Sequence, residues 1–154
     1  MPLSIADLAI TSPAFDFGAP IPSRFTGEGA DDSPELVFHG VPQGTRELAV
    51  VCHDPDAPLA HGFTHWVVYG IPADAGRIAE NGGGRFTEGV NDFGGTGYGG
   101  PMPPPGHGTH HYFFFLYALD TAITDGPGLS RLELLGRLDG HVLEMNRLVG
   151  TYER

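Results

Sequence analysis

The sequence predicts an all-β-dominated fold, a two-sheet antiparallel β-sandwich with one or two short helical segments near its C-terminal end. Three observations support this prediction. Short apolar runs are rich in β-branched and aromatic residues, turn-forming glycines and prolines separate them, and a helical pattern occurs only in the last quarter of the chain. The 154 residues are enough for one well-formed core, so we expect a single domain over residues 1–154.

Three runs are the strongest strand candidates: residues 48–53 (LAVVCH), 63–71 (FTHWVVYGI) and 112–119 (YFFFLYAL). The second and third are largely apolar on both alternating faces, which is typical of central strands in a sheet that is covered on both sides. Residues 36–38 and 85–88 are shorter candidates. The chain has 24 glycines and 14 prolines, and many of them fall between these runs, where they favour turns.

A capping-box pattern begins the helical segment, because Ser130 is followed three residues later by Glu133. Apolar residues then recur at helical spacing, at Leu132, Leu134, Leu135 and Leu138. Gly136 and Gly140 interrupt this pattern, so we expect two short helices or one kinked helix. The predicted helical stretch continues through residues 141–149 and ends at Gly150.

The charge of the chain disfavours two classes of partner. Eight Lys and Arg residues against 19 Asp and Glu residues give a net charge of −11 at pH 7, which repels nucleic acid and anionic membrane surfaces. No window is long and apolar enough for a membrane-spanning helix, and residues 1–15 lack a basic stretch followed by an apolar one. We therefore expect a cytoplasmic protein without stable membrane insertion. Cys52 is the only cysteine and is expected to be a buried, unreactive thiol.

Three polar motifs lie within the predicted strands or at their ends. The first is DPDAP (54–58), which presents Asp54 and Asp56 from a turn that two prolines stiffen. The second is His65, inside the second strand, where side-chain alternation predicts that it points away from Trp66.

The third motif, GYGGPMPPPGHGTHHY (97–112), runs directly into the third strand. Its His110 and Tyr112 share one face by strand alternation, whereas His111 lies on the other. We expect His110 and Tyr112 to line one pocket with His65 at an end of the sheet.

These residue types fit an anion pocket. Histidines donate N–H bonds, a glycine-rich backbone allows close approach to a ligand, and prolines form a rigid wall. Asp54 or Asp56 would orient a histidine and raise its pKa, and could also accept hydrogen bonds from an ammonium group. The set therefore suits a zwitterionic phosphate ester better than bare phosphate. Two simpler interpretations stay open: DPDAP as an ordinary Asp-Pro turn, and histidines that are hydrogen-bonded core residues.

The motifs resemble the phosphatidylethanolamine-binding protein family, also called Raf kinase inhibitor-like proteins, and in particular its short bacterial branch. The matching segments run in order along nearly the whole chain: TSPAF (11–15), IPSRFTGEG (21–29), SPELVFHGVP (33–42), DPDAP (54–58), HWVVYGIP (65–72), GYGGPMPPPGHGTHHYFFFLYALD (97–120) and LVGTYER (148–154). The combination of DPDAP, HWVVYGIP and GPxPPxGHGxHxY is far more specific than any one of these segments.

The resemblance implies a β-sandwich with a small cavity at one end that accepts phosphate, acetate-like anions or phosphoethanolamine head groups, without a cofactor. It carries ligand-binding roles to Asp54, Pro58, His65, Pro104, His110 and Tyr112, with Asp56 and Phe63 nearby and Met102 near the cavity mouth.

Two departures from the family pattern bear on function. The usual HRY triplet is HHY here, so His111 replaces an arginine and a structural salt bridge should be lost. The pocket should survive, because His111 faces away from His110. Eukaryotic members carry a C-terminal extension that shapes the cavity and regulates partners, whereas this sequence stops at Arg154. A kinase-inhibitor-like role therefore rests on the resemblance alone.

The leading hypothesis is a protein that binds small anions or phospholipid head groups and regulates an unknown protein partner. A hydrolase or metal-dependent enzyme is one alternative, since His and Asp side chains can serve as metal ligands or as acid and base. The sequence has neither HExxH nor GxSxG, which favours a protein without catalytic residues or metal ligands. The other alternative is a partner-binding protein or homodimer in which the pocket has no role.

Overall fold

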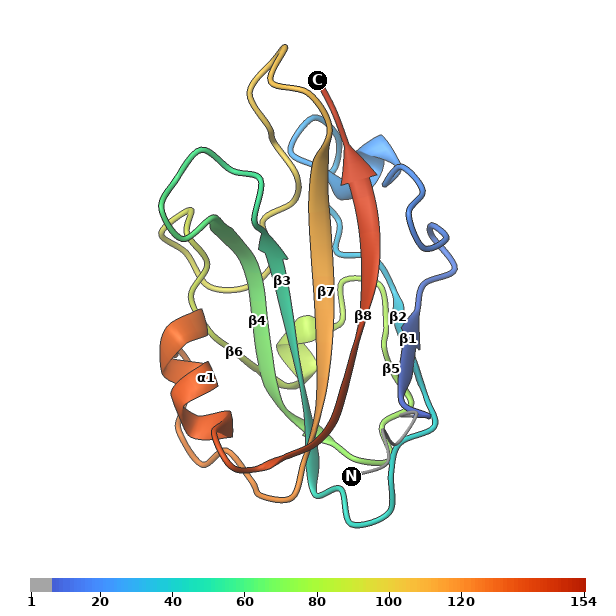
Figure 1. Cartoon of the computed structure of the whole chain (residues 1–154), viewed down its shortest axis with the longest axis vertical. Coiled ribbons are helices and arrows are strands. Elements are labelled where there is room, and N and C mark those ends of the chain that lie inside the picture. Colours follow the sequence, from blue (N-terminus) through green and yellow to red (C-terminus); the bar gives the residue numbers. More distant parts are fainter. Residues whose placement is uncertain (1–6) are drawn as a thin grey trace, which may run out of the picture.

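The computed structural model describes residues 7–154, which form two antiparallel sheets and one α-helix (Figure 1). The larger sheet has five strands in the order β6-β4-β3-β7-β8, and the smaller has three in the order β1-β2-β5. The strands are β1 (Ala9–Thr11), β2 (Leu36–His39), β3 (Glu47–Asp54), β4 (Phe63–Pro72), β5 (Arg77–Ile78), β6 (Thr87–Glu88), β7 (His110–Leu119) and β8 (Val142–Tyr152). The helix is α1 (Arg131–Leu138), and two short 3₁₀ turns are η1 (Ser23–Phe25) and η2 (Gly83–Arg85). The predicted two-sheet architecture is confirmed.

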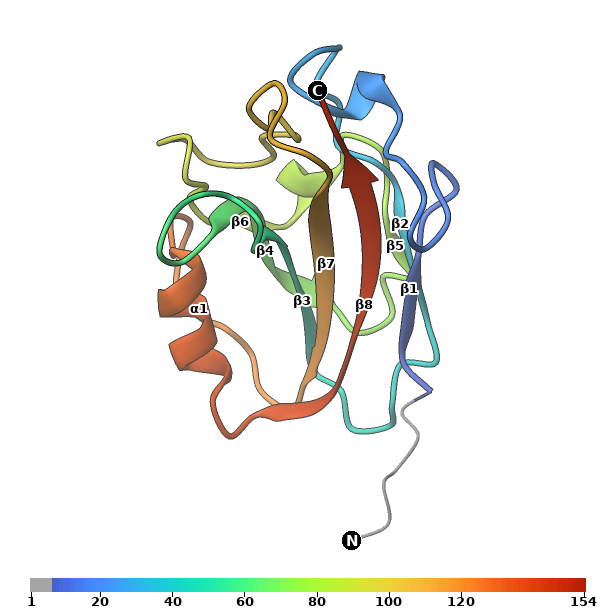
Figure 2. The ribbon, with the colours of Figure 1, turned by 45° about the horizontal axis from the view of Figure 1, so that its top comes forward.

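The larger sheet is the middle layer of the molecule. The smaller sheet lies on one side of it and α1 on the other (Figures 1 and 2). One core cluster, around Trp66 and Phe114, fills the space between the sheets, and a second, around Tyr69 and Leu134, lies between the larger sheet and α1. The central strands β3 and β4 and most of β7 are therefore buried, as predicted. Cys52 is fully buried in the first cluster, and burial raises the pKa of its thiol well above the usual value.

Helix α1 begins as predicted but ends early. Ser130 Oγ accepts a hydrogen bond from the Glu133 N–H at 3.1 Å, and Glu133 Oε1 accepts one from the Ser130 N–H at 3.0 Å, which completes the capping box. The prediction that the helical stretch continues to Gly150 is wrong, because β8 pairs with β7 along its whole length. Closing the otherwise open edge of β7 outweighs the helical spacing of the side chains. Within residues 7–154, no helix has the length and apolar character needed to cross a bilayer.

A β-bulge in β4 sets the direction of His65. Where β3 pairs with β4, Cys52 lies opposite Trp66 and the next pair skips His65, which is therefore an extra residue in the ladder. His65 and Trp66 consequently lie on the same face of the sheet. The centroid of the His65 ring is 5.1 Å from that of Tyr112, and Tyr112 shares a core cluster with Trp66. The predicted alternation of His65 and Trp66 is wrong, and the bulge is the reason.

Candidate functional site

The segments that carry the predicted site residues meet at one end of the larger sheet. β3 ends at Asp54, β4 begins at Phe63 after the intervening turn, and β7 begins at His110. Because neighbouring strands are antiparallel, the end of β3 lies beside the starts of β4 and β7, at the top of Figure 1. Residues 102–104 of the loop before β7 reach the same end.

A cavity of about 240 Å³ opens at this end. It is lined by Asp54, Ala57, Pro58, Leu59, Phe63, His65, Phe93, Met102, Pro103, Pro104, His110 and Tyr112. All the residues predicted from the sequence line the cavity except Asp56. Sequence reasoning missed Ala57, Leu59, Phe93 and Pro103. Three of these adjoin predicted residues in the chain, whereas no sequence signal pointed to Phe93.

Asp54 is buried, and both of its carboxylate oxygens are engaged. Oδ2 lies 2.7 Å from Nδ1 of His110, and Oδ1 accepts a hydrogen bond from the backbone N–H of Asp56 at 2.7 Å. The second contact belongs to the ordinary Asp-Pro turn of the simpler interpretation, and the first orients a histidine. Asp54 therefore both stabilises the Asp-Pro turn and orients His110.

His110 also has both ring nitrogens engaged. A carboxylate oxygen accepts, so Nδ1 of His110 carries the proton that it donates to Asp54. Nε2 lies 2.7 Å from Nδ1 of His107, a loop residue with no predicted role. His110 is buried whereas His107 is exposed to solvent. Asp54, His110 and His107 thus form a hydrogen-bonded chain that runs from the interior to the surface.

The backbone of the loop before β7 holds His65 in place. Nδ1 of His65 donates to the carbonyl oxygen of Gly99 at 2.6 Å, which leaves Nε2 as the ring nitrogen available to a ligand. Burial lowers the pKa of His65, although the Gly99 carbonyl and the charge of Asp54 act in the opposite direction. Asp54 therefore acts on the pKa of His65 in the direction predicted from the sequence, but burial outweighs it.

Aromatic rings surround His65 and supply one more polar atom. The ring centroids of Phe63, Tyr112 and Phe93 lie 4.9, 5.1 and 5.5 Å from that of His65. Burial raises the pKa of Tyr112 far above its usual value, so its hydroxyl stays protonated and can donate a hydrogen bond. The mostly apolar cavity thus presents two donors, the hydroxyl of Tyr112 and, when His65 is protonated, its Nε2.

The model of one protein family, phosphatidylethanolamine-binding protein, matches residues 11–153. The chain belongs to this family. A UPF0098 protein from Methanothermobacter thermautotrophicus is 45% identical over 147 residues, which cover 92% of this chain and 95% of the relative. A UPF0098 protein from Aquifex aeolicus is 40% identical over 157 residues, which cover 97% of this chain and 90% of the relative.

Two crystal structures of phosphatidylethanolamine-binding proteins share the fold. A homologue from Chlamydia trachomatis matches with a TM-score of 0.90 at 35% identity, covering 97% of this chain and 99% of the other. YbcL from Escherichia coli, described as a member of the mammalian family, matches with a TM-score of 0.91 at 33% identity and the same coverage. The resemblance seen in the motifs is therefore confirmed at the level of family and fold.

Asp56 lies outside the cavity and contacts His111, the residue that replaces the arginine usual in the phosphatidylethanolamine-binding proteins. Oδ2 of Asp56 lies 2.7 Å from the ring Nδ1 of His111 and accepts a hydrogen bond from its backbone N–H at 2.8 Å. Partial burial raises the pKa of Asp56, but the hydrogen bonds from His111 outweigh it and the pKa lies below its ordinary value. His111 therefore keeps a hydrogen bond to a carboxylate, and the loss of a permanently charged salt bridge with the arginine stays a prediction.

Exposed apolar side chains surround the mouth of the cavity. Leu59, Phe93 and Met102 are 59%, 53% and 42% exposed, respectively, and all three line the opening. Single exposed apolar residues are common on protein surfaces, whereas contiguous apolar patches are typical of interaction sites.

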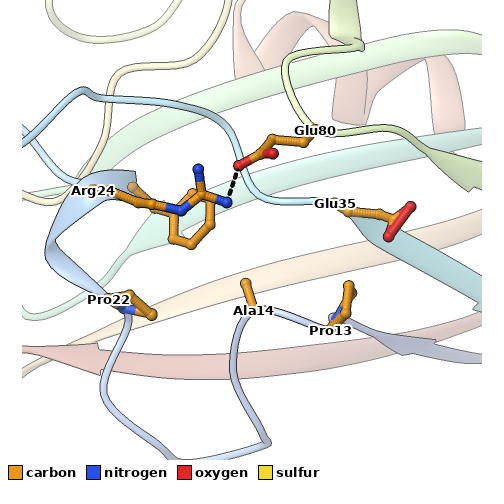
Figure 3. A pocket seen from close by; sticks show the side chains of 7 residues that line it. Pro13, Ala14, Pro22, Arg24, Glu35 and Glu80 are labelled. Carbon is orange, nitrogen blue, oxygen red and sulfur yellow. Dashed lines mark ion pairs between the residues drawn. The ribbon is translucent and has the colours of Figure 1, made fainter.

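A larger cavity of about 490 Å³ lies beside the N-terminal loop and the start of β2, and two of its charged residues, Arg24 and Glu80, form an ion pair (Figure 3). The Arg24 guanidinium stacks on Phe25, with its carbon 4.3 Å from the ring centroid, and forms an ion pair with Glu80. Glu35 pairs with Arg77 at 2.9 Å. Because the charged groups of this cavity already have partners, the smaller cavity, with its available donors, is the better candidate for a ligand site.

Proposed function

We propose that the protein binds small phosphate-bearing anions in the cavity at the end of the larger sheet, with a phosphoethanolamine-like head group as the preferred form. One observation carries the proposal: Nε2 of His65 and the hydroxyl of Tyr112 are available within a mostly apolar cavity of about 240 Å³. A few polar atoms in an apolar cavity orient a ligand and give specificity. Membership of the phosphatidylethanolamine-binding protein family supports the same ligand class.

Each part of such a head group has a partner in the cavity. Phosphate oxygens accept hydrogen bonds from protonated His65 and from the Tyr112 hydroxyl. The ammonium group packs against the faces of Phe63 and Phe93, which attract cations. It can also donate to Asp54, because each carboxylate oxygen keeps a second lone pair.

The apolar rim of Leu59, Phe93 and Met102 supports a ligand whose head group carries an apolar extension. A free head group would fill the cavity and leave these side chains in water. A ligand with a short acyl chain or another apolar substituent would cover them and gain affinity in proportion to the apolar area removed from water.

Titration of phosphoethanolamine followed by NMR of the histidine rings tests the proposal. We expect His65 and His110 to shift first, while the exposed His39 and His141, paired with Thr11 and Asp120, stay unchanged. His65→Gln should weaken binding by roughly tenfold or more, because a neutral amide replaces the positively charged imidazolium as the donor to phosphate. His39→Gln is the matched control and should bind like the unaltered protein. Shifts confined to His39 and His141 would contradict the proposal.

The role of the rim is tested by comparing phosphoethanolamine with dihexanoyl phosphatidylethanolamine below its micelle concentration. Replacing Leu59 and Met102 together by Ser should weaken binding of the acylated ligand and leave binding of the free head group within about twofold. Equal effects on both ligands would show that the rim contributes only to the shape of the cavity.

We further propose that binding occurs without catalysis. Across residues 7–154, no group of three or more His, Cys, Asp or Glu side chains is placed to hold a metal ion. Elemental analysis and hydrolysis assays with phosphate esters test this part of the proposal. One transition metal per chain, or ester turnover that disappears in His65→Gln, would contradict it. A cytoplasmic location and regulation of a protein partner stay predictions.

A further inference from the structure

His110 lines the cavity, but its ring has no polar atom free for a ligand. Nδ1 donates to Asp54 and Nε2 contacts Nδ1 of His107, each at 2.7 Å. An imidazole has only these two hydrogen-bonding atoms. A ligand that is to hydrogen-bond His110 must therefore take the position of the His107 nitrogen.

The contact between the two histidines persists in two protonation states. When His110 is neutral, its Nδ1 carries the proton, so Nε2 accepts and Nδ1 of His107 donates. When His110 carries a second proton, Nε2 donates and Nδ1 of His107 accepts through the other tautomer. Protonation of His110 alone therefore leaves His107 in place, and a competing acceptor is needed to displace it.

The loop allows His107 to leave without unfolding. The side chain is exposed, so its ring can turn into solvent without breaking core contacts. Gly106 and Gly108 flank it with φ of 75° and 91°, a left-handed conformation that glycine adopts at little cost. The loop itself is anchored separately, since the Gly106 N–H donates to the carbonyl oxygen of Arg154 at 3.0 Å.

We propose that His107 is an intramolecular competitor for the anion site, which occupies Nε2 of His110 until a phosphate monoester displaces it. This inference rests on the proposed anion-binding function and adds its regulation. In the closed arrangement, the phosphate group of a ligand has only the side-chain donors of His65 and Tyr112. In the open arrangement, protonated His110 adds a donor, so a dianionic phosphate that can accept from several donors is favoured over a carboxylate such as acetate.

Two substitutions at the same position test the competition by calorimetric titration with phosphoethanolamine. His107→Ala removes the competitor and should raise the affinity about fivefold, the equivalent of one ordinary hydrogen bond. His107→Asn places an amide where Nδ1 lies, so it should keep the affinity within about twofold of that of the unaltered protein. Ring NMR of the unaltered protein should show His107 moving to the shifts of a free imidazole on binding. His141→Ala, at an exposed histidine away from the site, is the control.

The outcomes separate this inference from the function on which it rests. Weaker binding by His107→Ala would make His107 a ligand-binding residue and overturn the competition. Unchanged affinity, with the His65 shift intact, would also overturn it while the anion site stands. If neither the unaltered protein nor His107→Ala binds phosphoethanolamine, the proposed function fails and this inference fails with it.

Discussion

Nδ1 of His110 lies 2.7 Å from Oδ2 of Asp54, and the two side chains are only 2% and 4% exposed. This contact joins the start of β7 to the end of β3 in the lining of the cavity. Hydrogen bonds to a charged group in such surroundings are stronger than neutral ones. The contact therefore contributes to the fold as well as to the orientation of His110.

Asp54→Asn should lower the free energy of unfolding by about 1–2 kcal/mol, because a charge-assisted hydrogen bond is replaced by a neutral one. Urea unfolding at neutral pH measures the change. Asp56→Asn is the matched control, since Asp56 lies in the same turn but pairs with His111 at an exposed position. Asp56→Asn should change the free energy of unfolding by no more than about 0.5 kcal/mol. Equal losses in the two variants would contradict the assigned role of Asp54.

Anion affinity should rise as the pH falls. With Nδ1 of His65 donating to Gly99, Nε2 can donate to an anion only when the ring is protonated, and burial lowers the pKa of that ring. The free protein is therefore mostly neutral at His65 near neutral pH and takes up a proton on binding. The affinity should increase by up to about tenfold for each pH unit between about 8 and about 6.

Glycerophosphoethanolamine suits this measurement, because its phosphate diester keeps a single negative charge across that range. Calorimetry in buffers of different ionisation enthalpy should detect uptake of about one proton per ligand bound. His65→Gln should bind more weakly and with little dependence on pH. An affinity that stays constant with pH, or that falls as the pH falls, would contradict this use of His65.

The strand core and most of the cavity could be predicted because their signals are local. Apolar runs identify β3, β4 and β7, and the polar motifs fall where these strands begin or end, so antiparallel pairing brings them together. Asp54, His65 and His110 are therefore visible in the sequence as candidates.

The remaining features depend on contacts between segments that are distant in the chain. Residues 142–152 have side-chain spacings compatible with a helix, and only the free edge of β7 makes them a strand. The direction of His65 depends on a bulge in the register against β3. The role of His107 depends on a loop folding back onto His110. None of these long-range contacts produces a periodic pattern of residue types in the sequence.

The capping box of α1 is a local feature with a measurable contribution. Ser130→Ala removes the acceptor of the Glu133 N–H and should lower the free energy of unfolding by about 1 kcal/mol. Ser130→Asp keeps an acceptor at the N-cap, so its free energy of unfolding should stay within a few tenths of a kcal/mol of that of the unaltered protein. Urea unfolding compares the two. A similar loss in both variants would show that Ser130 acts through something other than the cap.

His53 should make the protein less stable in mild acid. Its Nδ1 lies 3.1 Å from the Thr64 hydroxyl, and burial, aided by the charge of Arg131, lowers its pKa from 6.5 to about 4. The unfolded chain binds a proton at this histidine below about pH 6.5, whereas the folded chain does so only near pH 4, so acid favours unfolding between these values.

The free energy of unfolding should therefore fall as the pH drops through that window, by at most about 3 kcal/mol from His53. Urea unfolding at a series of pH values measures this slope. In His53→Gln, which stays neutral and keeps hydrogen-bonding capacity towards Thr64, the slope should be shallower. The free energy of unfolding of His53→Gln should still depend on pH to some extent, because the lowered pKa of His65 acts in the same direction. Identical slopes in the two proteins would contradict this role, because they would show that the pKa of His53 is the same in the folded and unfolded states.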